Sequence, residues 1–280
     1  MFTKAERLIS SRNLKPKKKD GFLKIISIFS FLGITLGVAI LIIVMSVMNG
    51  FKTDLTKKIL GLNPHIVIQS SDSKIEDDFE DLLIKKFENI RISKSFSGEG
   101  LVLNQDNAKG IIIKGIDVEK TENLSFLKKK MHKGNFKELK KNTAFIGAEM
   151  AFNLNLDIGD KINLMSSAFV STPFGGFPKQ ETYIISGIFR TGFYEFDQNF
   201  VFLELSNVLS IFDKNNNEQN LEIYLKDPMK AEVYKKEIQK LNTNYFIYSW
   251  TDLNKSFFGA LKVERNVMFI ILTLIIVVAA

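Results

Sequence analysis

The residue types that most often carry chemistry are scarce in this sequence. It has two histidines, His65 and His132, which lie 67 positions apart, and it has no cysteine. A metal site or a proton relay needs several such side chains at close spacing, so a lone histidine favours a structural role. The lack of cysteine removes thiolate ligands and cysteine nucleophiles. No metal site and no cofactor is predicted.

Glu195 and Asp197 are a pair of carboxylates that could suggest general acid–base catalysis. In a strand, positions i and i+2 face the same side, yet solvated or turn-bonding carboxylates explain the pair more simply. The phosphate-binding motif G-x-x-x-x-G-K-S/T, the nucleophile motif G-x-S-x-G and the zinc motif H-E-x-x-H are all absent. We therefore expect that the chain is not an enzyme.

The strongest signal is an apolar stretch. Residues 25–48 carry no charge, and as a helix they would cover about 36 Å, which is enough to cross a hydrocarbon core of about 30 Å. Gly33 and Gly37 form a G-x-x-x-G pair, which is either a site of close helix packing or an ordinary feature of membrane helices. This stretch is predicted to be a transmembrane helix.

Charge gives the orientation of that helix. Residues 1–24 contain eight Lys and Arg against Glu6 and Asp20, so they hold a net +6 of the whole chain's +7. Such an excess keeps a flanking segment in the cytoplasm. The apolar core is too long for a cleaved signal peptide, and the nearly neutral remainder gives no reason to expect nucleic-acid binding.

The chain ends in a second uncharged stretch, residues 267–280. As a helix it would reach only about 21 Å, short of a full span. We expect the chain to be cut off inside a second transmembrane helix; a buried helix is the alternative.

Residues 49–266 are predicted to form an α+β domain outside the cytoplasm. Helical stalks are expected at 49–62 and 250–266, the second as part of one continuous helix from residue 250 to the end. Two β-α-β segments, within 63–99 and 206–249, are predicted to pair in one sheet. Residues 100–205 read as glycine-separated strands, with a short helix near 148–154, and are interpreted as an inserted β-rich subdomain.

Residues 168–179, with the sequence AFVSTPFGGFPK, are unusual because three phenylalanines lie among two prolines and two glycines. This composition favours a loop that exposes aromatic side chains as a contact surface. The alternative is that these rings pack beneath the sheet.

Several segments of the sequence resemble one family. They are ERLISSRNL, ISIFSFLGITLGVAILIIVMSVMNGFKTDL, KILGLNPHI, LNLDIGDKINLMS, GIFRTGFYEFD and ERNVMFIILTLIIVVAA. These are similar to the lipoprotein-releasing system permeases, the LolC/LolE family. The resemblance implies an inner-membrane, multi-pass subunit whose large domain lies in the periplasm between its first two spans.

The resemblance also implies function and partners. With a separate cytoplasmic ATPase and a second permease subunit, identical or different, such a protein extracts lipoproteins from the membrane lipid and passes them to a periplasmic carrier. A hairpin contacts the carrier in one family member. The matching residues here are Pro173, Phe174, Gly175, Phe177, Pro178, Lys179 and Gln180. Glu181 follows them, at a position where a basic residue would suit the carrier-binding member better.

For acyl chains of the lipoprotein, apolar side chains near the outer leaflet are the candidates: Val44, Met48, Val267 and Met268. Two other classes stay open from the residues. One is a two-span sensor with a periplasmic ligand-binding domain, and the other is a related mechanotransmission permease of the macrolide-exporter or cell-division type.

Overall fold

The computed structural model describes residues 3–13, 21–70, 75–104, 107–118, 125–172, 175–215, 218–242 and 244–279. The chain divides into two compact units. The helical unit comprises Met1–Thr56 and Lys255–Ala280, and the sheet unit comprises Lys57–Asn254.

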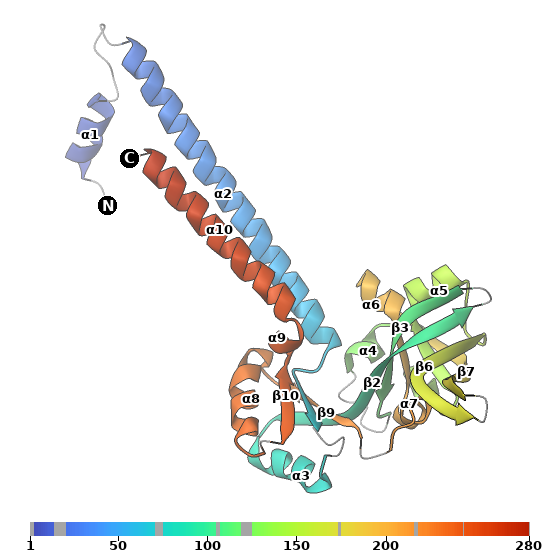
Figure 1. The fold of residues 1–280 in the computed structure, drawn as a ribbon. Coiled ribbons are helices and arrows are strands. Elements are labelled where there is room, and N and C mark those ends of the chain that lie inside the picture. The colour runs from blue at the N-terminus through green and yellow to red at the C-terminus, as the bar shows by residue number, and fades with distance from the viewer. Residues whose placement is uncertain are drawn as a thin grey trace. The chain divides into compact units, whose positions relative to one another are not determined.

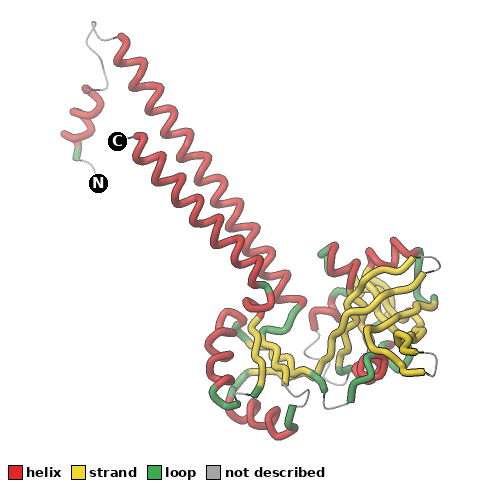
Figure 2. The backbone as a smooth tube through the Cα atoms, in the orientation of Figure 1, coloured by secondary structure: helices red, strands yellow, loops and turns green. Residues whose placement is uncertain are grey.

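The helical unit is built from three helices, α1 (Lys4–Asn13), most of α2 (Gly21–Leu62) and α10 (Lys255–Ala279) (Figures 1 and 2). A methyl group added at Gly37 of α2 would lie 3.7 Å from the Ile275 side chain of α10, whereas Gly33 faces open space. One glycine of the G-x-x-x-G pair therefore lies at a helix contact. Within the described residues, α2 is the one helix long and apolar enough to cross a membrane by length and composition.

The sheet unit is organised around one ten-stranded sheet with the strand order β10-β1-β9-β2-β3-β8-β5-β7-β4, while β6 pairs with β2 and β7. Its strands are β1 (Ile66–Ser70), β2 (Ile90–Asn104), β3 (Asn107–Ile116), β4 (Met131–Gly134), β5 (Thr143–Gly147), β6 (Lys161–Thr172), β7 (Gly175–Phe189), β8 (Phe200–Glu204), β9 (Asn220–Leu225) and β10 (Tyr245–Ser249).

The two predicted β-α-β segments pair in one sheet. Strand β1 pairs antiparallel with both β10 and β9, and β9 pairs antiparallel with the first half of β2. Helices α3 (Asp77–Lys86) and α8 (Ala231–Gln239) complete this part. It encloses buried side chains that include Ile66, Leu83, Ile223 and Ile238, which explains the alternating apolar pattern of these strands.

Strand β2 joins the two parts of the sheet unit. Its residues 90–95 pair with β9, and its residues 95–104 pair with β3. The predicted boundary between residues 99 and 100 therefore falls inside a continuous strand, because a strand of this length can take different neighbours at its two ends.

The β-rich part also carries short helices: α4 (Ser125–Lys129), η2 (Phe136–Glu138), α5 (Ala148–Leu154), α6 (Tyr194–Asn199) and α7 (Leu205–Ile211). Its core contains Ile113, Ile146, Leu164, Ile185 and Leu203, all fully buried. A side chain at Gly147 would come within 1.9 Å of the Asp197 carbonyl oxygen, so only glycine fits where β5 turns into α5.

Two predicted local structures are wrong. Residues 194–199 are helical rather than extended, because buried Asp197 accepts hydrogen bonds from the Thr191 amide, the Thr191 hydroxyl and the Gly192 amide and fixes a tight turn. The helix from residue 250 is also interrupted. It consists of α9 (Trp250–Leu253) and α10, and the Asn254 amide between them donates to the Trp250 carbonyl at 2.8 Å, a contact that competes with regular helix geometry.

Candidate functional site

The two histidines occupy different surroundings. Buried His65 accepts a hydrogen bond at Nδ1 from the Leu225 amide at 2.8 Å. Burial, and then the positive charge of Arg91, lower the pKa of His65, so it is neutral at pH 7 and structural. His132 is exposed on β4. No group of three or more metal-ligating side chains occurs within the described ranges.

Residues 168–172 and 175–179 belong to an antiparallel hairpin rather than to a loop. Strands β6 and β7 pair from Lys161↔Ile184 to Thr172↔Gly175, with an irregularity between Met165 and Phe169. Pro178 lies opposite Phe169 beside this irregularity, where its missing N–H is tolerated. Gly175 has φ +119°, a conformation that favours glycine. Pro173 and Phe174 lie outside the described residues.

The inner half of the hairpin, residues 161–166 and 179–184, is anchored to α7. The Ser166 hydroxyl donates to the Ile211 carbonyl at 2.5 Å, and the Lys179 ammonium donates to the Ser210 carbonyl at 2.7 Å. Glu181 accepts from the Tyr183 hydroxyl at 2.6 Å. Burial, and then this carboxylate, raise the pKa of Tyr183. Lys179 and Glu181 are thus engaged in contacts within the unit.

The outer half of the hairpin has apolar side chains on both faces. Phe169, Val170 and Phe177 are 65%, 47% and 55% exposed. Phe169 pairs with Pro178 and Val170 pairs with Phe177, and successive residues of a strand point to opposite faces. Neither face of this half is covered by the core of the unit. Gln180 lies in the inner half next to Lys179, and its side-chain amide contacts the Met165 sulfur.

A groove of about 550 Å³ lies beside the hairpin and is lined by residues of both its halves and of strands β2 and β3. Phe169, Pro178, Met165 and Ser166 form one wall, and residues of β2 and β3 such as Gly100 and Ile111 form the other. The sequence did not predict this groove, because it depends on the β2–β6 pairing between distant segments.

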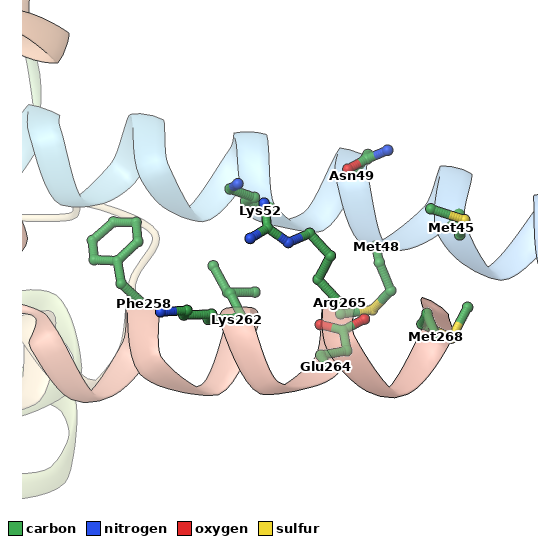
Figure 3. Close-up of a pocket in the computed structure, with 10 residues that line it drawn as sticks. Met45, Met48, Asn49, Lys52, Phe258, Lys262, Glu264, Arg265 and Met268 are labelled. Carbon is green, nitrogen blue, oxygen red and sulfur yellow. The ribbon is translucent and has the colours of Figure 1, made fainter. Parts of the chain in front are cut away.

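A second groove, of about 280 Å³, lies between α2 and α10 in the helical unit (Figure 3). Met48 and Met268 line it, whereas Val44 and Val267 are exposed and do not line it. The other lining residues were not predicted: Met45, Asn49, Lys52, Phe258, Leu261, Lys262, Glu264 and Arg265. Their helical spacing, for example positions 45, 48, 49 and 52, is the signal that could have found them.

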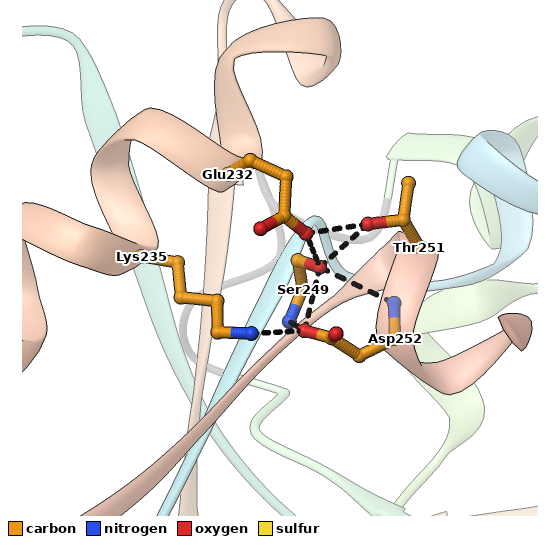
Figure 4. A network of polar contacts seen from close by, with 5 residues as sticks. All are labelled: Glu232, Lys235, Ser249, Thr251 and Asp252. Carbon is orange, nitrogen blue, oxygen red and sulfur yellow. Dashed lines mark hydrogen bonds and ion pairs between the residues drawn. The ribbon is translucent and has the colours of Figure 1, made fainter.

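A polar network surrounds the end of β10 and the start of α9 (Figure 4). The Ser249 hydroxyl contacts the Glu232 carboxylate, Thr251 and Asp252, and Lys235 forms an ion pair with Asp252 at 2.6 Å. Hydrogen bonds from Ser249 and Thr251 lower the pKa of Glu232. Burial would raise the pKa of Asp252, but hydrogen bonds from Lys235 and Ser249 outweigh it and lower this pKa. The network stabilises the start of α9 as a capping box.

Comparisons with known proteins identify the family. A family model described as the MacB-like periplasmic core domain matches residues 27–241. The lipoprotein-releasing system transmembrane protein LolC of Neisseria meningitidis serogroup B is 30% identical, over 98% of this chain and 68% of that protein. LolC of Xylella fastidiosa is 26% identical over 100% and 68%, and LolE of Haemophilus influenzae is 26% identical over 97% and 67%.

These matches and the fold define an ABC-transporter permease with a MacB-like periplasmic core domain. The chain belongs to the lipoprotein-releasing system permeases, the LolC/LolE family. The apolar helix near its N-terminus fits an inner-membrane protein.

Solved structures give a weaker likeness. The periplasmic region of MacB from Actinobacillus actinomycetemcomitans has a TM-score of 0.44 and 12% identity, over 70% of this chain and 93% of that one. The extracellular domain of the transporter YknZ from Gram-positive bacteria has a TM-score of 0.43 and 11% identity, over 66% and 99%. At these values nothing further follows from them.

Proposed function

We propose that this chain is the permease subunit that extracts lipoproteins from the inner membrane and passes them to a periplasmic carrier. A separate cytoplasmic subunit hydrolyses ATP, and a second permease subunit, identical or different, completes the complex. The observation that carries the proposal is the outer half of the β6–β7 hairpin, whose exposed Phe169, Val170 and Phe177 have no covering element within the described sheet unit. Exposed aromatic groups of this kind mark protein contact surfaces.

In this proposal the carrier docks on the outer half of the hairpin. Gly175 provides the turn, and Phe177 and Pro178 supply opposite faces. Lys179 holds the hairpin in place through its hydrogen bond to the Ser210 carbonyl and is not itself the main contact with the carrier. Because the inner half is held on α7, the docking surface is presented with little loss of conformational entropy.

Acyl chains of the lipoprotein are proposed to contact Met48 and Met268 in the groove between α2 and α10, with exposed Val44 and Val267 beside them. Methionine suits this role because its flexible thioether adapts to varied apolar partners. In this proposal the lipoprotein contacts the protein where the uncharged stretches of α2 and α10 adjoin their charged segments.

Helix α2 is proposed to carry movement from the membrane to the sheet unit, since it continues without interruption from residue 21 to residue 62. An interior proline removes a helix hydrogen bond and costs about 3 kcal/mol or more. In the full-length complex, Leu55→Pro should therefore reduce ATP-driven lipoprotein release to the carrier while ATP hydrolysis continues.

Leu55→Ala is the matched control, because it removes the same side chain and leaves the helix intact. Ala260→Pro in α10 gives a second test, with a smaller effect expected because the chain is already interrupted at Asn254. Parent-like coupling of release to hydrolysis in Leu55→Pro would show that α2 is not a lever.

The proposal places the sheet unit outside the cytoplasm, on the net +6 charge of residues 1–24. A cysteine introduced at exposed Lys137 should react with an impermeant thiol reagent in cells whose outer membrane has been opened. A cysteine at Lys17 should be protected. The reverse labelling pattern would overturn this orientation.

A further inference from the structure

The groove between α2 and α10 combines two kinds of surface. Met45, Met48 and Met268 give it an apolar part, and Lys52, Lys262 and Arg265 lie along the same groove with a single acidic neighbour, Glu264. Figure 3 shows the Arg265 side chain extending from α10 toward Lys52 of α2. The lining thus carries an excess of positive charge next to an apolar floor.

The position of these cations along the chain is informative. Lys52 is the first charged residue after the uncharged stretch of α2, and Arg265 is the last charged residue before the uncharged end of α10. Both line one groove, so the change from charged to uncharged surface occurs at the same level on both helices. In a bilayer that level is the boundary between lipid headgroups and hydrocarbon.

The cations have no anionic partner in the part of the chain that the structure describes. Lys52, Lys262 and Arg265 take part in none of its salt bridges or side-chain hydrogen bonds. Like charges that converge on a groove repel each other unless an anion lies between them. A ligand that matches the groove therefore carries an anionic group for its cations and an apolar group for its methionines.

We propose that this groove binds one anionic glycerophospholipid from the leaflet at which α2 leaves the membrane. Lys52 and Arg265 hold the phosphate, Lys262 adds positive charge, and one acyl chain lies against Met48 and Met268. Arginine and lysine both bind phosphate oxygens well. A phospholipid satisfies both ends of the groove at once, whereas an acyl chain alone leaves the cations unused and a free phosphate leaves the methionines exposed.

This inference goes beyond the proposed function, because it concerns a resident membrane lipid and requires neither ATP nor the carrier. It predicts that lipoprotein cargo and phospholipid compete for the methionines of the groove, while only the phospholipid uses the cations.

The test uses the full-length protein in mild detergent, titrated with palmitoyl-oleoyl phosphatidylglycerol or palmitoyl-oleoyl phosphatidylethanolamine and read by native mass spectrometry. The parent should bind the anionic lipid about tenfold more tightly than the zwitterionic one. Lys52→Gln/Arg265→Gln should lose this preference. The control Lys57→Gln/Lys255→Gln has the same charge change on the same two helices, at residues that do not line the groove, and should keep it.

Two further arms distinguish the source of the anion and the role of the methionines. Inorganic phosphate at millimolar concentration should not displace the bound lipid, and Met48→Trp, which fills the apolar part, should weaken binding of both lipids. The proposal is overturned if the parent shows no preference, if the control variant loses it as fully as the groove variant does, if phosphate displaces the lipid, or if Met48→Trp binds like the parent. Thermal unfolding of each variant verifies that the helices remain folded.

Discussion

Two regions of the sheet unit reverse the usual distribution of polar and apolar side chains, in opposite senses. In the middle of the sheet, Lys114 of β3 and Glu222 of β9 form an ion pair at 2.8 Å with side chains only 10% and 6% exposed. The second carboxylate oxygen of Glu222 accepts from the Tyr224 hydroxyl at 2.8 Å. At the outer half of the hairpin, large apolar side chains are exposed instead.

The two regions differ in whether the unusual side chains have a partner within the sheet unit. Buried Lys114 and Glu222 have each other, and because β2 lies between their strands, the pair connects the two parts of the sheet. Phe169 and Phe177, in contrast, stay more than half exposed within their own unit. Buried charge therefore indicates an internal structural contact, and exposed aromatic surface indicates an external partner.

The largest expected effect comes from breaking the buried pair. Lys114→Met leaves the Glu222 carboxylate buried without its counter-charge, which should cost about 3–5 kcal/mol of unfolding free energy. Denaturant unfolding of the variant beside the parent measures it.

Lys114→Met/Glu222→Gln is the matched control, because it leaves no buried charge and keeps an acceptor for the Tyr224 hydroxyl. It should recover most of the loss. If the single variant were as stable as the parent, the pair would not hold the sheet together.

The next effect concerns the exposed aromatic side chains. Phe177→Ala should weaken carrier binding by about 2 kcal/mol or more, as loss of a central aromatic anchor does, while thermal unfolding stays unchanged. Phe169→Ala should behave in the same way, and Phe174, which lies outside the described residues, is predicted to do so as well. Calorimetric titration with the purified carrier measures the affinity.

Phe152→Ala is the control for this prediction. Phe152 is 82% exposed on α5, outside the hairpin, so its removal should change neither carrier binding nor stability. A lowered melting temperature with unchanged affinity in Phe177→Ala would assign that ring to folding rather than docking.

A smaller effect is expected in the polar network before α10, which combines burial with partial exposure. Ser249→Ala removes the capping hydroxyl of α9 and should cost about 1 kcal/mol. It also removes the main hydrogen bond that lowers the pKa of Glu232, so this pKa should rise toward its ordinary value.

The low pKa values of Glu232 and Asp252 contribute stability that is present above their ordinary values of 4.5 and 3.8 and is lost as the pH falls through the folded-state values. Parent and Ser249→Ala should therefore differ less in stability in acid than at neutral pH. Thermal unfolding of both as a function of pH tests this, and a constant difference would contradict it.

The smallest effect concerns His65, a buried group without a counter-charge. Its pKa is lowered in the folded state, so below its ordinary value of 6.5 the unfolded chain binds a proton first and stability decreases. His65→Asn keeps an acceptor for the Leu225 amide and cannot titrate. The melting temperature of the parent should fall more than that of His65→Asn between about pH 7.5 and about pH 5; equal decreases would exclude a contribution from His65.

The sequence by itself determined the local elements that depend on short-range patterns. The uncharged residues 25–48 lie within α2, the β-α-β segment predicted within 206–249 contains β9, α8 and β10, and the short helix predicted near 148–154 is α5. The motifs also predicted the LolC/LolE family correctly. These signals succeed because helix and strand periodicity and membrane partitioning act over a few residues or one helix.

Only the tertiary structure decided the contacts between distant segments. The pairing of β2 with β9, β3 and β6, the Lys114–Glu222 pair and the contact of Lys179 with α7 each join residues that no local pattern links. The same holds for Asp197, whose buried carboxylate turns a predicted strand into a helix, and for the cations that share a groove with methionines of another helix. Such contacts form only when folding brings the elements together, because the chemistry of each residue is compatible with many partners and geometry selects one.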